Sequence, residues 1–163
     1  MTGATMHVAF YKGRERLFNR AVSGYLRGPY SHCELVLWTD NGWSYCASSS
    51  FMDGGVRTKR IQLNPAHWDL VPVVASQTRA LVWVRAHEGD GYDLLGLAGF
   101  VWRPFTGEKC KWVCSEAVAA MLGFPDPWRF DPMVLYCALM ARGQISAAAA
   151  TRTKTTRGEL AHA

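Results

Sequence analysis

The sequence lacks any apolar run of the roughly 18 residues that a transmembrane helix requires. Its first segment, MTGATMHVAFYKGRERLF, lacks the basic stretch followed by an apolar stretch that marks a secretory signal peptide. With 49% hydrophobic and 19% charged residues, the composition excludes a disordered chain. These absences predict a globular protein without a membrane span that is cytoplasmic as synthesised.

Runs of basic residues with interleaved aromatic side chains are also missing, so no nucleic-acid partner is expected. The net charge is +5, from 18 Lys and Arg against 13 Asp and Glu, and it favours acidic partners only weakly. The 163 residues are enough for one domain with a single core. We expect that domain to cover residues 1–145 and a flexible basic tail to cover residues 146–163.

The cysteines lack the paired spacing of a disulfide framework. They are five in number, Cys33, Cys46, Cys110, Cys114 and Cys137, which predicts reduced thiols. Cys110 and Cys114 lie four apart, but no second Cys or His pair stands at ligand spacing. No metal ion and no organic cofactor are therefore expected.

Strand patterns come first along the chain and helical patterns later. Strands are expected at residues 6–13, 31–38, 43–50, 56–63 and 68–74, and helices at residues 14–27, 76–89, 92–102, 114–122 and 131–143. The Asn41-Gly42 pair predicts a tight hairpin turn, and Pro72 indicates an edge strand. Ser76 and Asp131 are expected to cap helices. An antiparallel meander followed by helices predicts an α+β fold.

Cys114 is the candidate nucleophile, since it stands at the first turn of the helix expected for CSEAVAAML. Unpaired backbone N–H groups and the helix dipole lower the pKa of a thiol there and can stabilise an oxyanion. A thiol nucleophile needs a base, and His32 on the strand SHCELVLW is a candidate. Glu34 lies two residues further on the same strand face and could orient the imidazole ring.

Structural roles compete with these assignments. A cysteine near a helix start is more often a core residue than a nucleophile, and a histidine on a strand is more often structural. Cys33 points away from His32 on the strand and is expected to pack in the core. Glu34 could instead form an ion pair with Arg57 or Arg60 from a neighbouring strand.

The segments SHCELVLW, WVCSEAVAAMLG and FDPMVLYCAL occur in this order along the chain. Together they resemble the circularly permuted branch of the NlpC-type papain-like cysteine peptidases and amidases, over residues 5–143. The resemblance implies a permuted papain-like fold, in which an antiparallel sheet packs against helices. It also implies that Cys114 is the nucleophile and His32 the base.

The third catalytic residue departs from the pattern of that family, which takes it from the strand after the histidine. Here that strand, WSYCASSS, offers serines but no His, Asn or Glu. Glu34 is therefore preferred, with Ser48 as the alternative. Trp112 and Tyr30 are added as candidates for contact with the substrate.

The resemblance implies a cysteine hydrolase that cleaves an amide bond in a peptidoglycan peptide or an isopeptide through a thiol acyl-enzyme. The alternatives are a thiol acyltransferase or lipid-directed hydrolase acting on an acyl amide or ester, and a non-catalytic structural or binding module of a phage particle. The stretch SSSFMDGGVR is similar to small phage and prophage proteins. That likeness implies delivery with a phage particle. Secretion by a non-classical route is the alternative.

Overall fold

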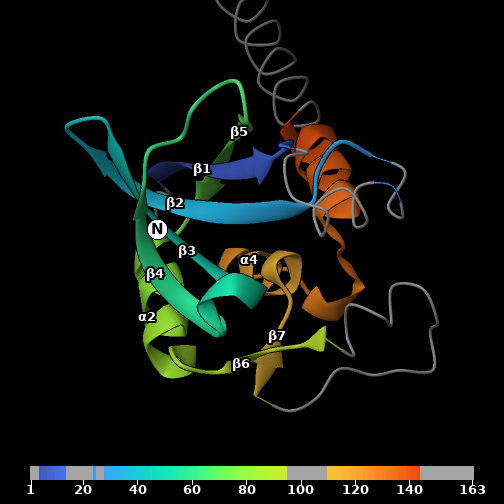
Figure 1. Ribbon diagram of the computed structural model, residues 1–163. Helices are drawn as coiled ribbons and strands as arrows, with labels where there is room; N and C mark the ends of the chain where they lie inside the picture. The colour runs from blue at the N-terminus through green and yellow to red at the C-terminus, as the bar shows by residue number, and fades with distance from the viewer. Residues whose placement is uncertain (1–3, 14–23, 25–27, 95–109, 144–163) are drawn as a thin grey trace, which may run out of the picture.

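The computed structural model describes residues 4–13, 24, 28–94 and 110–143, which form a curled sheet with helices on one face (Figure 1). The strands are β1 (Ala4–Tyr11), β2 (His32–Asp40), β3 (Trp43–Ser50), β4 (Gly55–Ile61), β5 (Trp68–Ala75), β6 (Gly91–Tyr92) and β7 (Lys111–Trp112). Their order across the sheet is β5-β1-β2-β3-β4-β6-β7, and neighbours are antiparallel except β6 and β7. The predicted α+β class with an antiparallel meander is confirmed.

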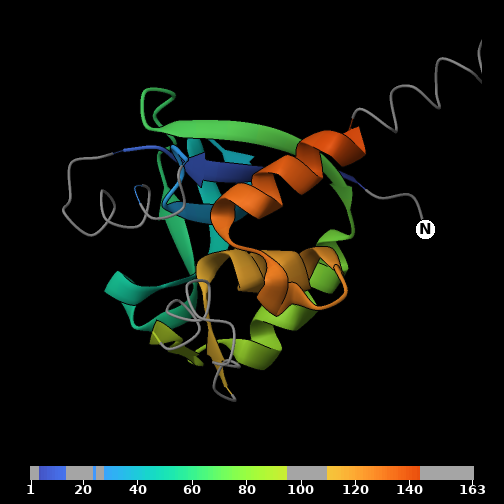
Figure 2. The same ribbon diagram turned by 90° about the vertical axis from the view of Figure 1, so that its right-hand side faces the viewer.

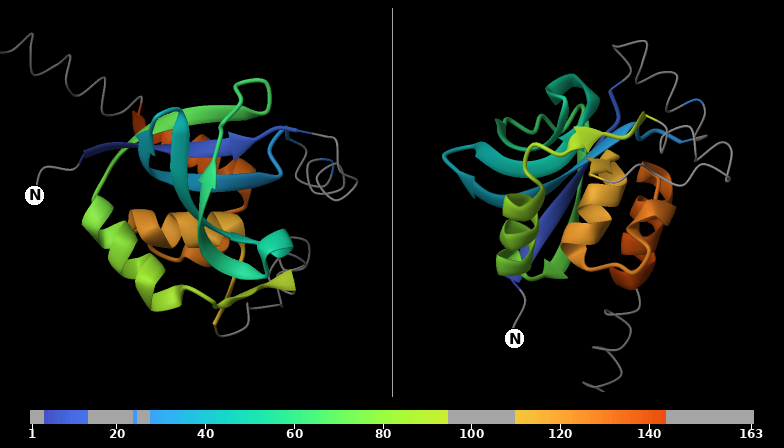
Figure 3. Two further views of the ribbon diagram at one scale, coloured as in Figure 1. Left: turned by 60° about the vertical axis from the view of Figure 1, so that its left-hand side comes forward. Right: turned by 90° about the horizontal axis from the view of Figure 1, so that it is seen from below.

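Helices α2 (Gln77–His87) and α4 (Cys114–Leu122) and a helix over residues 132–143 lie side by side on one face of the sheet (Figures 2 and 3). Two short 3-10 helices, η1 (Phe51–Asp53) and η2 (Pro127–Arg129), join elements. The predicted caps are present, because Ser76 Oγ accepts a hydrogen bond from the Arg79 amide and Asp131 Oδ1 accepts one from the Val134 amide. No helix in the described ranges is long and apolar enough to cross a membrane.

The two faces of β2 carry different side chains because successive residues of a strand point to opposite sides. Cys33 and Leu35 face the helices and are fully buried in the main core with residues of α4 such as Val118. Val36 belongs to a smaller apolar cluster on the other face. His32 and Glu34 share the Val36 face, so both lie inside the curl of the sheet, where they line a cavity.

Local sequence signals explain the edges and turns of the meander. Asn41 and Gly42 adopt positive φ angles of 48° and 76°, which a tight hairpin between β2 and β3 requires. Strand β5 lies at the edge of the sheet, where Pro72 pairs with His7 of β1. Both predictions from the sequence are confirmed, because both depend on backbone geometry that a few neighbouring residues decide.

One predicted boundary is wrong, since Tyr92 belongs to strand β6 and not to a helix. The Gly91 amide donates to the Cys110 carbonyl and the Asp93 amide to the Trp112 carbonyl, so β7 holds this segment in the sheet. Strands of two residues carry no periodic pattern, and neither β6 nor β7 was predicted. The remainder of that predicted helix falls largely outside the described residues, as do the helix over 14–27 and the tail over 146–163.

Candidate active site

The Cys114 thiol lies where β2 and β3 separate. Their pairing ends at Leu35 and Ala47, although β3 continues beside β4 as far as Ser50. Helix α4 contacts both strands and begins at Cys114, with Val113 as its N-cap residue. The side chain and the amide of Cys33, beyond the last pair, both act to lower the pKa of the Cys114 thiol. The first residue of α4 therefore lies close to the first residues of β2.

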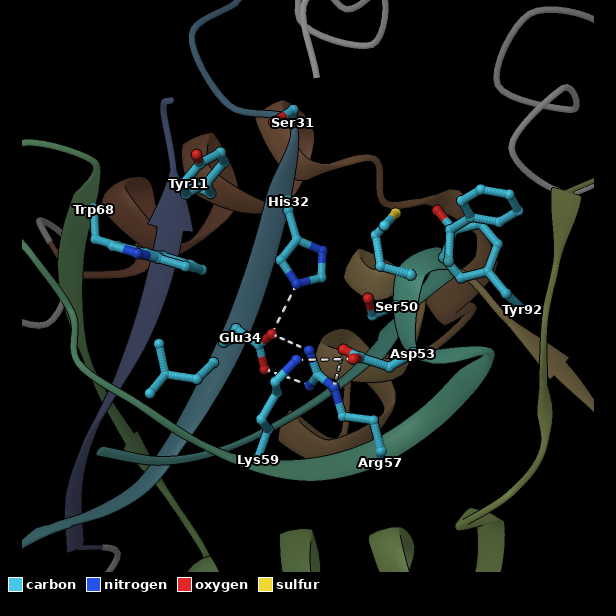
Figure 4. Close-up of a pocket in the computed structure, with 13 residues that line it drawn as sticks. Tyr11, Ser31, His32, Glu34, Ser50, Asp53, Arg57, Lys59, Trp68 and Tyr92 are labelled. Carbon is cyan, nitrogen blue, oxygen red and sulfur yellow. Dashed lines mark hydrogen bonds and ion pairs between the residues drawn. The ribbon is translucent and has the colours of Figure 1, made fainter. Parts of the chain in front are cut away.

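His32 interacts with both this thiol and Glu34. Its Nε2 atom lies 2.8 Å from Oε1 of Glu34 (Figure 4), and the ring also interacts electrostatically with Cys114. Since Nε2 is occupied by Glu34, Nδ1 is the ring nitrogen left for the thiol. The carboxylate is only 1% exposed. His32 and Glu34 are therefore close together, as expected. The side chains follow one another in the order Cys114, His32, Glu34.

Glu34 is held on its other side by Arg57, which extends from β4. Arg57 Nη2 lies 2.5 Å from Glu34 Oε1 and Nη1 lies 2.8 Å from Oε2, a bidentate pair. Arg57 Nε donates to Asp53 Oδ2 at 2.9 Å, and Lys59 Nζ donates to Asp53 Oδ1 at 2.8 Å. The two roles weighed for Glu34, a contact with His32 and an ion pair with an arginine, are both present.

Charge and hydrogen bonding set the protonation of the thiol and the imidazole. The hydrogen bond from the Cys33 side chain, together with the charge of His32, holds the pKa of Cys114 well below its ordinary value against the effect of burial. Burial opposes a charge on His32, but the Cys114 thiolate and Glu34 raise the pKa of His32 to about 10. The structure therefore favours a thiolate–imidazolium pair at neutral pH.

Glu34 remains ionised although it is buried. Burial alone would raise the pKa of its carboxyl group, but hydrogen bonds from His32 and Arg57 lower it. Arg57 has a raised pKa, because the bonds to Glu34 and Asp53 outweigh burial. The carboxylate therefore presents a negative charge to the imidazolium.

A cavity of about 360 Å³ lies beside His32 and Glu34, inside the curl of the sheet (Figure 4). Aromatic and aliphatic side chains form much of its wall: Tyr11, Phe51, Met52, Ile61, Trp68 and Tyr92. Cys114 is 2% exposed and is not part of this wall. The His32 ring lines the cavity, whereas the thiol does not.

The other candidates have structural partners. The Tyr30 hydroxyl donates to Asp69 Oδ2 at 2.8 Å, and its ring packs against Tyr136. Trp112 Nε1 donates to Asp90 Oδ2 at 3.0 Å, and its ring packs edge-on against Trp83. Neither Tyr30 nor Trp112 lines the cavity among the described residues. Contact of either residue with a substrate stays a prediction.

Ser48, the alternative third residue, is directed to the backbone. Its Oγ atom donates to the Cys33 carbonyl at 2.7 Å and is fully buried. Ser48 pairs with Arg57 and follows Ala47, which pairs with Leu35, so it stands between Glu34 and Arg57 in the sheet. A small side chain at this position allows Arg57 to reach Glu34.

The role of Ser48 can be tested by Ser48→Ala. We expect the free energy of unfolding to fall by about 1 kcal/mol, because a buried carbonyl loses its donor. The pH midpoint of Cys114 alkylation should stay unchanged, because Ser48 does not contact His32. Thermal unfolding and alkylation measured on the same sample check both parts. If the pH midpoint of Cys114 alkylation shifted while the stability stayed unchanged, Ser48 would be the third catalytic residue.

Two residues of the site were not recognised from the sequence. Cys33 packs in the core as expected, but its side chain and amide also lower the pKa of Cys114. Arg57 was considered only as a structural partner of Glu34. The single local signal is that β4 carries a basic residue opposite the small Ser48, and it becomes meaningful only once the strand pairing is known.

The described ranges contain no group of three or more His, Cys, Asp or Glu side chains placed to hold a metal ion. No protein-family model, curated protein or solved structure matches the chain significantly.

Proposed function

We propose that this protein is a cysteine hydrolase of permuted papain-like fold that cleaves an amide bond through a thiol acyl-enzyme. One observation carries the proposal: a thiol at the start of a helix meets a histidine whose second ring nitrogen is bonded to a buried carboxylate. A thiol is activated for acyl transfer when a base lies beside it and an orienting group lies on the far side of that base.

In the proposed reaction the Cys114 thiolate attacks the carbonyl carbon of the amide. Backbone N–H groups in the first turn of α4 stabilise the oxyanion. The C–N bond then breaks as the His32 imidazolium gives its proton to the leaving amine, which leaves a thioester on Cys114. Neutral His32 next takes a proton from water, and the hydroxide formed attacks the thioester. The carboxylic acid leaves, and the Cys114 thiolate and the His32 imidazolium are restored.

The cavity is the binding site for the part of the substrate next to the scissile amide bond. Its wall is largely apolar, and the charged side chains in it are paired with one another. Because the buried Cys114 thiol does not line the cavity, attack requires the side chains around Cys114 to shift when the carbonyl enters. The resemblance to NlpC-type enzymes points to a peptidoglycan peptide or an isopeptide as the substrate.

The test is alkylation of Cys114 by iodoacetamide as a function of pH, followed by peptide mass spectrometry. We expect a reactive thiolate that persists well below pH 8. The pKa of Cys114 is lowered in the folded protein, so the thiolate is lost only as pH falls through this lowered pKa. The pH midpoint is the readout, because burial of Cys114 slows the absolute rate. In His32→Gln, without the positive charge, the midpoint should rise to about 8.5 or higher.

A midpoint near 8.5 in the unaltered protein would overturn the proposed mechanism and favour a non-catalytic module. The exposed Cys110 and Cys137 report the pH dependence of the probe in the same sample. Glu88→Gln, an exposed charge change at the end of α2, is the matched control for the histidine variant.

A second candidate is acyl transfer to an amine or alcohol, favoured by the apolar cavity wall and the 2% exposure of Cys114. Water reaches a buried thioester poorly, so an acceptor that binds in the cavity could compete with it. Incubation with acyl esters and muropeptides, with and without an added amine, separates the two reactions, because only transfer yields the new amide.

A further inference from the structure

Arg57 lies at the centre of a row of alternating charges that begins at the imidazole. Its guanidinium bonds to Glu34 through both terminal nitrogens and to Asp53 through Nε (Figure 4). Its side chain is 15% exposed, whereas that of Lys59 at the outer end of the row is 51% exposed. Arg57 is thus the last largely buried cation between the imidazole and solvent.

We infer that Arg57 is a positioning residue that keeps the Glu34 carboxylate ionised and aimed at His32, and that Asp53 fixes Arg57 in that pose. The inference rests on the proposed function, since it assigns to Arg57 a part in forming the Cys114–His32 pair. It goes further because it connects this pair to η1, whose residues Phe51 and Met52 form part of the cavity wall.

The charge balance of the site supports this role. With Cys114 and Glu34 negative and His32 and Arg57 positive, the buried charges cancel. Without Arg57 the same cluster would carry one net negative charge in a poorly solvated place, and such a charge is costly. A proton would then be taken up by the carboxylate or the thiolate, and the thiolate would form only at higher pH.

Geometry adds a second effect. A bidentate arginine–carboxylate pair fixes the plane of the carboxylate as well as its charge, which a single ammonium group cannot do. Gly54, at φ 84°, ends η1, and a Cβ on Gly55 would collide with the Asp90 carbonyl, so these glycines allow the chain to turn from Asp53 into β4. Asp53 is thereby placed beside Arg57, four residues further on.

Other titratable groups face the same cluster, and they are the same in the unaltered protein and in every variant compared below. Besides burial, the charge of Glu34 raises the pKa values of Cys33 in β2 and Cys46 in β3. Besides burial, the charge of Cys114 raises the pKa of Tyr92 in β6. Asp93 acts on Tyr92 and on Glu116 of α4. None of these groups is altered in the variants below.

The experiment measures the pH midpoint of Cys114 alkylation by iodoacetamide in the full chain for Arg57→Met, Arg57→Lys and Asp53→Asn. Lys59→Met is the matched control, because Lys59 bonds to Asp53 but not to Glu34. We expect the midpoint to rise by about one pH unit or more in Arg57→Met, so that the rate at a pH below the midpoint falls about tenfold. Arg57→Lys and Asp53→Asn should give smaller rises, and Lys59→Met none.

Midpoints in Arg57→Lys and Asp53→Asn equal to that of the unaltered protein would overturn the inference, and these variants decide the question if Arg57→Met does not fold. A rise in Lys59→Met as large as in Arg57→Met would also overturn it, because any nearby cation would then suffice. If the unaltered protein has an ordinary midpoint near 8.5, the proposed function fails instead. A fall in melting temperature alone would show a purely structural pair.

Discussion

Cys114→Ala is expected to abolish turnover of amide and ester substrates, with a fall of at least about 10⁴-fold in kcat. The acyl group has no other attachment point in the proposed mechanism, so no partial activity should remain. The melting temperature should change little, because alanine fits a first-turn position of α4 and Ala117, one turn later, is equally buried. Turnover of a panel of muropeptides, isopeptides and acyl esters, measured beside thermal unfolding, checks the expectation.

Cys46→Ala is the matched control for this variant. Cys46 is also fully buried, but it lies in the smaller apolar cluster with Ala9 and Val36, away from α4. Its replacement should lower stability slightly and leave turnover per folded molecule unchanged. Equal turnover in Cys114→Ala and the unaltered protein would remove the thiol from the mechanism.

Glu34→Gln is expected to lower turnover by roughly 10- to 10⁴-fold. The amide keeps the size of the side chain but cannot stabilise the imidazolium by charge, and it can present the wrong hydrogen-bonding group to His32 Nε2. The structure adds a cost in stability, because Arg57 loses a charged partner. We expect the free energy of unfolding to fall by about 1–3 kcal/mol.

The two losses in Glu34→Gln can be separated. Turnover must be normalised to the folded fraction at a temperature well below the melting transition. A loss of stability with full turnover per folded molecule would reduce Glu34 to a partner of Arg57. Glu88→Gln, which removes a carboxylate from an exposed helix end, should change neither quantity.

The sequence alone determined the features that depend on neighbouring residues. The hairpin at Asn41 and Gly42, the caps at Ser76 and Asp131, and the edge position of Pro72 follow from backbone geometry over a few residues. The shared face of His32 and Glu34 follows from the two-residue period of a strand, and the structure confirms that the two side chains meet.

Only the tertiary structure decided which distant groups join them. Arg57 reaches Glu34 because β4 lies two strands from β2 and because Ser48 between them is small. Cys33 meets Cys114 because β2 and β3 separate where α4 begins. Residue spacing along a strand is set locally, but strand order, the end of a ladder and the seating of a helix are set by packing of the whole core. The partners of the carboxylate and of the thiol were therefore decided by the fold.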